Sequence, residues 1–143
     1  MTIRPYVRRT QFYETDQMGI IHHANYIRWF EEARVDFLDQ VGFSYGRART
    51  EGIDFAVLGV SCEYKSMTRF QEEVAILVGI GALTPARMTV TYRITDAATG
   101  ALRVTGESRH CFVRSEGLRP VSLKKAIPAL YEIFAAQTRP PTG

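Results

Sequence analysis

The chain has 143 residues, of which 45% are hydrophobic and 23% are charged. This length favours a single domain over residues 1–143, and these proportions are typical of globular proteins rather than disordered ones. The net charge is +3, acidic residues are interspersed throughout, and no basic run exceeds two residues. These features argue against nucleic acid as a partner. The longest apolar stretch, residues 74–83, is too short to span a membrane.

The positions of the cysteines and histidines indicate the cellular compartment and whether a metal site is expected. Cys62 and Cys111 have no CxxC spacing and fall in expected strands, and the N-terminal segment lacks the apolar core of a signal peptide. We therefore expect a cytoplasmic protein. His22 and His23 are adjacent, so on a helix they point to different sides and make a poor chelating pair. No metal site is expected.

The first half of the chain predicts a strand followed by one long helix. The strand is expected over residues 6–14. From residue 23 to residue 41, apolar residues recur at steps of three and four, which is the pattern of an amphipathic helix. Gly42 is a natural stop for that helix. Residues 43–52 are expected to form a loop or a short helical turn.

The second half predicts strands joined by short connections. Strands are expected over residues 53–67, 73–83, 87–95 and 101–114, followed by a helix from Pro128 to about Gln137 and a flexible tail over 138–143. The strand over 87–95 alternates apolar and polar residues, so one of its faces should be exposed to water. The whole order predicts an α+β fold, in which an antiparallel five-stranded sheet wraps around one long central helix.

The strand over 74–83 also bears on assembly. It is apolar on both faces, whereas one helix can cover only one of them. The other face, or an edge of the sheet, needs a cover, and a second copy of the chain is the simplest candidate. We therefore expect a homo-oligomer, either a dimer or a tetramer of dimers. Complete coverage by the C-terminal helix is the alternative.

The segment that joins the first strand to the long helix is the richest in chemistry. Asp16 lies a few residues before the start of this helix. Unpaired backbone N–H groups and the helix dipole favour negative charge there, so they could keep Asp16 ionised and also bind an oxyanion. From the residues alone, a loop or capping role for Asp16 remains open.

The run Tyr13-Glu-Thr-Asp-Gln-Met-Gly-Ile-Ile-His-His-Ala-Asn-Tyr26 resembles the signature of the 4-hydroxybenzoyl-CoA thioesterase-like acyl-CoA thioesterases, which have the hotdog fold. The spelling departs from the commoner pattern at Glu14 and His22. The resemblance implies that Asp16 acts on a thioester carbonyl, as a nucleophile or as a general base. It also implies that the backbone N–H of His23 polarises this carbonyl, with no cofactor beyond the coenzyme A of the substrate.

The same resemblance suggests how the substrate is held. Of the 18 basic residues, 15 are arginine, whose planar fork suits phosphate. The positions expected to contact the coenzyme A phosphates are Lys65, Arg69, Arg87 and Arg114. The other residues expected to contact substrate are Tyr13, Gly19, Asn25, Tyr26 and Leu58. The acyl pocket is expected between the long helix, the 53–64 strand and the partner chain.

Two other functions remain open at this point. One is a non-catalytic protein of the same fold that binds acyl-CoA or an acyl carrier, with Asp16 as a structural loop residue. The other is a dehydratase or hydratase, whose acid would come from the helix at Glu31 or Glu32. The sequence specifies neither the acyl group nor the choice between coenzyme A and a carrier protein as donor.

Overall fold

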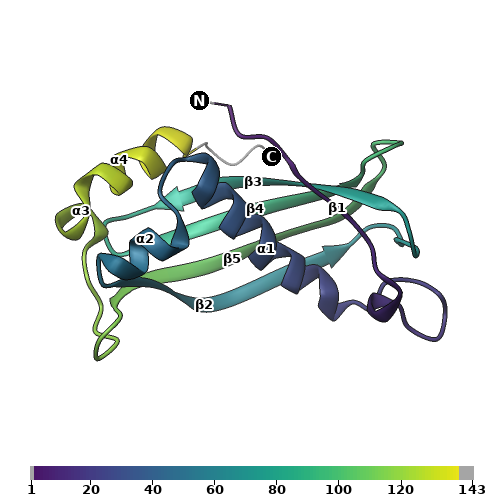
Figure 1. The fold of residues 1–143 in the computed structure, drawn as a ribbon, viewed down its shortest axis with the longest axis horizontal. Helices are drawn as coiled ribbons and strands as arrows, with labels where there is room; N and C mark the ends of the chain where they lie inside the picture. Colours follow the sequence, from purple (N-terminus) through teal and green to yellow (C-terminus); the bar gives the residue numbers. More distant parts are fainter. Residues whose placement is uncertain (1, 139–143) are drawn as a thin grey trace.

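The computed structural model describes residues 2–138. Its elements, in chain order, are β1 (Tyr6–Arg9), the 3-10 turn η1 (Phe12–Glu14), α1 (Ala24–Gln40), α2 (Tyr45–Thr50), β2 (Ile53–Tyr64), β3 (Glu73–Leu83), β4 (Arg87–Asp96), β5 (Leu102–Arg114), α3 (Leu123–Ala126) and α4 (Pro128–Gln137). They form one sheet with helices packed on it (Figure 1). Within the described residues, no helix is both long enough and apolar enough to cross a bilayer.

The sheet has five strands in the order β1-β3-β4-β5-β2, and every neighbouring pair is antiparallel. The long ladder between β2 and β5 runs from the pair Ile53↔Arg114 to the pair Tyr64↔Val104. Its register shifts between Val57 and Gly59, which leaves Leu58 in a bulge. Because β2 is the last strand in this order, it is an edge strand, and its outer side is unpaired within the described residues.

α1 lies across one face of this sheet (Figure 1) and buries its apolar stripe there. Trp29 and Phe30 are fully buried, and the Phe30 ring stacks on Tyr92 of β4 with 4.1 Å between centroids. Opposite Phe30 stands Gly106 of β5, where an added Cβ would lie 2.6 Å from the Phe30 ring. Burial of each large apolar side chain contributes about 1.5–3 kcal/mol, so this contact fixes α1 on the sheet.

α4 covers the other end of the same face. Its Phe134 is fully buried and packs with Phe37 of α1 and Phe55 of β2, at centroid distances of 6.4 and 6.1 Å. The edge strand β2 is less well covered, because Val57 and Val60 remain 53% and 40% exposed. A strip of apolar side chains along β2 is therefore exposed to solvent.

The predicted long helix, the strands β2 to β5 and the final helix are all present, with differences at their ends. The first strand ends at Arg9 instead of residue 14, because the chain turns into η1. β2 ends at Tyr64, three residues before its predicted end. The four-residue helix α3 was not predicted. Thr138 closes α4 through a hydrogen bond to the Phe134 carbonyl, and the rest of the predicted tail lies outside the described residues.

The strand predicted to be apolar on both faces shows alternating burial. Its even-numbered residues from Val74 to Ile80 face the helices and are buried. On the opposite face Leu77 is 45% exposed between small residues. One face is therefore covered by the chain itself, and the other is a half-exposed apolar surface.

Candidate functional site

The segment between η1 and α1 is a tight loop held by its own backbone. Thr15 and Ile21 form an isolated bridge, and the Asp16 N–H donates to the Ile20 carbonyl at 2.8 Å. Gly19 turns the chain with φ of +76°, a conformation that side-chain-bearing residues rarely adopt. The loop thus carries Asp16 on one limb and leads directly into α1 on the other.

Asp16 is half-buried, and one of its two carboxylate oxygens has no hydrogen-bond partner within residues 2–138. Its Oδ1 accepts a hydrogen bond from the Met18 N–H at 2.8 Å. No lysine, arginine or histidine of the described chain lies within ion-pair distance of this carboxylate. The backbone therefore fixes the carboxyl group through one oxygen and leaves the other available to a ligand.

The buried carboxylate of Glu14 anchors the start of this loop. Only 3% of the residue is exposed, and it accepts hydrogen bonds from Arg8 at 2.9 Å, the Gln11 N–H at 2.8 Å and Trp29 Nε1 at 2.7 Å. Burial alone would raise the pKa of this carboxyl. The bonds from Arg8, Trp29 and Gln11 outweigh burial and lower the pKa below its ordinary value. Glu14 is therefore ionised at neutral pH.

The Glu14 backbone extends the same anchor to the helix start. Its carbonyl oxygen accepts from the His22 N–H and from Asn25 Nδ2, both at 2.8 Å. The residue two positions before Asp16 is thus tied to β1, to the loop and to α1. The sequence identifies Glu14 only as a departure from the commoner thioesterase motif. Its role as an anchor is not visible there, because its partners Arg8 and Trp29 come from other elements.

The start of α1 offers a free backbone donor. His23 occupies the N-cap position without a side-chain cap, and its backbone N–H has no hydrogen-bond partner between residues 2 and 138. Its carbonyl accepts from the Tyr64 hydroxyl at 3.1 Å, which ties β2 to this point. An unpaired N–H at the positive end of a helix can polarise a carbonyl or stabilise an oxyanion.

Asn25 and Tyr26, which were predicted to contact substrate, have structural partners. Asn25 is 6% exposed and, besides holding the Glu14 carbonyl, accepts a 3.3 Å bond from Arg28. Tyr26 is 3% exposed and packs against the rings of Trp29 and Tyr64, and its burial raises the pKa of the phenol. Asn25 therefore supports the loop and Tyr26 supports the packing of α1 against β2, and their predicted contacts with substrate remain predictions.

The other predicted contact residues lie on the surface. Tyr13 is 79% exposed beside the Asp16 loop, and Leu58 is 45% exposed at the β2 bulge. Gly19 serves the loop through its backbone conformation.

The four predicted phosphate-binding cations fall at two ends of the sheet. Lys65 follows β2 and pairs with Glu63 at 2.8 Å, and Arg69 is bridged to Ile20 of the loop. By contrast, Arg87 begins β4 and Arg114 ends β5, which places both near the other end of β2. A single chain therefore does not gather these four side chains around one ligand.

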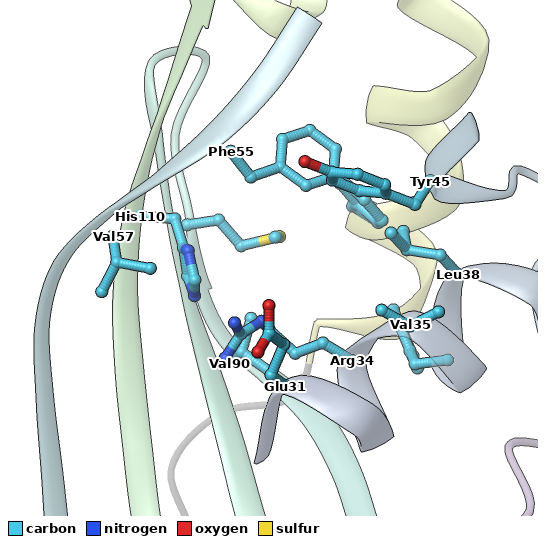
Figure 2. Close-up of a pocket in the computed structure, with 12 residues that line it drawn as sticks. Glu31, Arg34, Val35, Leu38, Tyr45, Phe55, Val57, Val90 and His110 are labelled. Atoms are coloured by element: carbon cyan, nitrogen blue, oxygen red, sulfur yellow. The ribbon is translucent and has the colours of Figure 1, made fainter. Parts of the chain in front are cut away.

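A cavity of about 210 Å³ lies between α1, the sheet and α4. Figure 2 shows Arg34 and Glu31 reaching from α1 toward His110 of β5, with Phe55 and Tyr45 at the other end. Most of the lining is apolar, but Val35, Tyr45 and Val57 are 41–53% exposed. The cavity therefore opens to solvent between α1, α2 and β2. The lining comes partly from the long helix and the 53–64 strand, between which a pocket was expected, but the contributions of α2, β4, β5 and α4 were not predicted.

A chain of hydrogen bonds forms the polar wall of this cavity. Arg34 Nη1 donates to the Tyr92 hydroxyl at 2.9 Å, this hydroxyl lies 2.6 Å from Ser108 Oγ, and Ser108 Oγ lies 2.7 Å from His110 Nε2. Burial, and then the charge of Arg34, lower the pKa of His110 to about 4, so its imidazole is neutral at pH 7. The one available sequence signal was the polar pair Ser108 and His110 at inward positions of a strand.

Comparison with known proteins gives consistent results. The family model described as the thioesterase-like superfamily matches residues 10–132. The acyl-CoA thioester hydrolase YbgC of Escherichia coli O157:H7 is 27% identical over 87% of this chain and 92% of its own length.

Solved structures of similar fold agree with these sequence matches. The DHNA-CoA thioesterase of Staphylococcus aureus superposes with a TM-score of 0.88 at 28% identity, over 93% of this chain and 89% of that one. A hypothetical protein of Aquifex aeolicus superposes with a TM-score of 0.83 at 33% identity, over 91% and 98%. The family match spans far more than half of the chain and agrees with the resemblance carried by residues 13–26. The chain is a thioester hydrolase that belongs to the thioesterase-like superfamily.

Proposed function

We propose that this protein hydrolyses acyl-CoA thioesters to the free acid and coenzyme A, with Asp16 as the catalytic residue. The observation that carries the proposal is the loop itself. It combines a carboxylate that has a free oxygen with an unpaired backbone N–H at His23, at the N-terminus of α1. The names of the E. coli and S. aureus relatives support coenzyme A as the donor.

Two routes use the same atoms. In the first, the free oxygen of Asp16 attacks the thioester carbonyl carbon, the C–S bond breaks with its electron pair going to sulfur, and water then hydrolyses the acyl-aspartyl anhydride. In the second, Asp16 removes a proton from a water that attacks the same carbon, and the C–S bond again breaks with its electron pair going to sulfur. In both routes the carbonyl oxygen gains negative charge, which the His23 N–H stabilises.

The acyl group needs a pocket, and a second copy of the chain brings one to Asp16. On α1 the cavity begins at Glu31, about 10 Å along the axis from the helix start near Asp16, at about 1.5 Å per residue. If two copies pair antiparallel along β2, the Tyr64 end of one strand meets the Ile53 end of the other. The Asp16 loop of one chain then lies beside the cavity and Arg114 of its partner.

The open edge supports this pairing. β2 exposes unpaired backbone groups together with Val57, Leu58 and Val60, and such an edge commonly joins another strand. On this proposal α1 is the central helix of a hotdog domain, and the sheet of the pair is continuous across β2. The same arrangement brings cations from both ends of the sheet, Lys65 and Arg69 with Arg87 and Arg114 of the second copy, around one coenzyme A.

Steady-state hydrolysis of aryl, short-chain and long-chain acyl-CoAs, followed with a thiol-detecting reagent, tests the activity. We expect Asp16→Asn to lower kcat by about 100-fold or more while circular dichroism stays unchanged, because the amide can neither attack nor accept a proton. Asp39→Asn, at an exposed position of α1, is the matched control and should keep the wild-type rate.

Wild-type turnover by Asp16→Asn would contradict this mechanism. Tight binding without hydrolysis by the wild-type protein would favour the binding-protein alternative.

A further inference from the structure

The loop that carries Asp16 rests on the connection between β2 and β3, residues 65–72. The Ile21 N–H donates at 2.9 Å to the carbonyl of Thr68, a fully buried residue. Ile20 forms an isolated bridge with the next residue of the same segment, and its carbonyl accepts from the Asp16 N–H at 2.8 Å. The position of Asp16 therefore depends on where segment 65–72 lies.

Arg103 of β5 holds this segment near both of its ends. Its Nη1 donates to Ser66 Oγ at 3.1 Å, and its Nη2 donates to the Glu72 carboxylate at 3.0 Å. The Arg103 carbonyl also accepts from the N–H groups of Lys65 and Ser66. A planar guanidinium has donors on separate nitrogens and can bridge two such points, whereas the single ammonium of a lysine cannot. Arg103 thus fastens segment 65–72 to the sheet.

Asp96, at the end of β4, fixes the guanidinium of Arg103 in turn. Its Oδ2 accepts from Arg103 Nη2 at 3.3 Å, while its Oδ1 accepts from the N–H groups of Ala98 and Thr99 at 2.9 and 2.8 Å. Led by the bond from the Thr99 N–H, these contacts lower the pKa of Asp96 to about 2, so this carboxylate is charged at neutral pH. Asp96 therefore keeps the guanidinium directed at the segment.

The segment needs this support because its backbone is strained. Gln71 has a φ of +70°, in the left-handed region that residues with a side chain rarely occupy. Such strain persists only where neighbouring contacts impose it, and it is concentrated at functional sites. On one side of Gln71, the ion pair of Glu72 with Arg103 holds the chain. On the other side, Thr10 Oγ1 donates to the Arg69 carbonyl at 2.8 Å. Without the ion pair, the segment should relax away from this conformation.

We propose that Arg103 is a positioning residue for Asp16 and acts together with Glu72 and Asp96. Its side chain is 16% exposed and forms no hydrogen bond or ion pair with the Asp16 loop in the described chain. Its effect therefore passes through the backbone of segment 65–72. With that segment held, the carboxylate keeps its place near the unpaired N–H at the start of α1. This proposal rests on the proposed function, because it takes Asp16 as the reacting group.

Two variants break the support at different points. Glu72→Ala removes one anchor but leaves Asp96 to pair with the guanidinium, and Arg103→Lys keeps the charge but not the two-point bridge. Each should lower kcat about tenfold at saturating acyl-CoA, with an unchanged circular dichroism spectrum, because the reacting carboxylate is misplaced. The double variant should be no worse than the more impaired single one, since both break one link. Glu73→Ala, at the next position and paired with exposed Arg9, is the matched control and should keep the wild-type kcat.

A glycine at position 71 separates positioning from a general loss of stability. Glycine adopts a φ of +70° without strain, so adding Gln71→Gly to Glu72→Ala should restore kcat to within about threefold of the wild-type value. Gln71→Ala keeps the strain and should restore nothing. Recovery with neither residue, or equal recovery with both, would overturn the proposal.

Hydrogen exchange tests the same link without relying on turnover. In Glu72→Ala, the amide of Ile21, whose acceptor is the Thr68 carbonyl, should exchange about tenfold faster or more, because the loop opens locally. The amide of Tyr131, which bonds to the Ile127 carbonyl within the C-terminal helices, should keep its wild-type rate.

Failure of this proposal differs from failure of the proposed function. If Asp16→Asn hydrolyses thioesters at the wild-type rate while the Ile21 amide responds as expected, the proposed role of Asp16 fails and the support of its loop by Arg103 stands. If the Ile21 amide is unchanged in Glu72→Ala, or is accelerated equally in Glu73→Ala, the positioning role is overturned whatever the turnover.

Discussion

At the scale of single residues, the ion pair of Glu14 with Arg8 holds the Asp16 loop in place. Both side chains are nearly buried, and Arg8 also lies over the Trp29 ring, 4.6 Å from its centroid. Replacing Glu14 with glutamine keeps the shape but leaves the guanidinium short of its buried partner. We expect a loss of about 2–4 kcal/mol in the free energy of unfolding at pH 7, measured by urea titration. Glu51→Gln, at an exposed position, should change it by less than about 0.5 kcal/mol.

The pH dependence of this loss follows from the direction of the pKa shift. The folded-state pKa of Glu14 is lower than the unfolded one, so its stabilisation is complete above the ordinary carboxyl pKa of about 4.3 and disappears as pH falls through the folded-state value. The gap between wild type and Glu14→Gln should therefore narrow from about pH 5 downward. A gap that stays constant between pH 7 and pH 3 would show that the charge of Glu14 contributes nothing.

At the scale of elements, the packing of α1 on the sheet depends on the absence of a side chain at Gly106. An added Cβ there would lie 2.6 Å from the Phe30 ring and 2.7 Å from the Ser61 carbonyl, and the carbonyl belongs to a paired strand that cannot easily move. Gly106→Ala should cost about 1–3 kcal/mol of unfolding free energy in thermal or urea denaturation. Gly46→Ala is the matched control. On α2 its Cβ meets nothing closer than 4.0 Å, and the change should be neutral or stabilising by up to about 1 kcal/mol. Equal destabilisation by both would contradict this packing.

The elements also show how far sequence alone can lead. α1 and β4 were predictable because their apolar residues repeat with the periods of a helix and a strand, and α4 because Pro128 marks its start. α3 has only four residues, too few for any period to be visible. Asp16 was found because its motif is contiguous. A pocket between α1 and β2 was expected, but its polar wall was not, because Arg34 and His110 come together only when α1 packs on the sheet, and no local pattern records that contact.

At the scale of the whole molecule, the proposed function requires two chains. Val60→Lys places a charge on the open edge of β2 and should convert a dimer into a folded monomer that no longer hydrolyses thioesters, as judged by sedimentation, circular dichroism and turnover. Leu77→Lys, on the half-exposed face of β3, should leave that dimer intact and would dissolve only a larger assembly. A wild-type protein that sediments as an active monomer would contradict the shared site.

Mixing two inactive chains tests the shared site directly. Asp16→Asn lacks the carboxylate, and Val35→Arg fills the cavity of the chain that carries it, from α1. If each site combines Asp16 of one chain with the cavity of the other, a mixed dimer has one site with both defects and one with none. Equal amounts, unfolded and refolded together, should then recover about a quarter of the wild-type activity, because half of the dimers are mixed and each has one intact site. If both parts came from the same chain, every site would carry a defect and no activity would return.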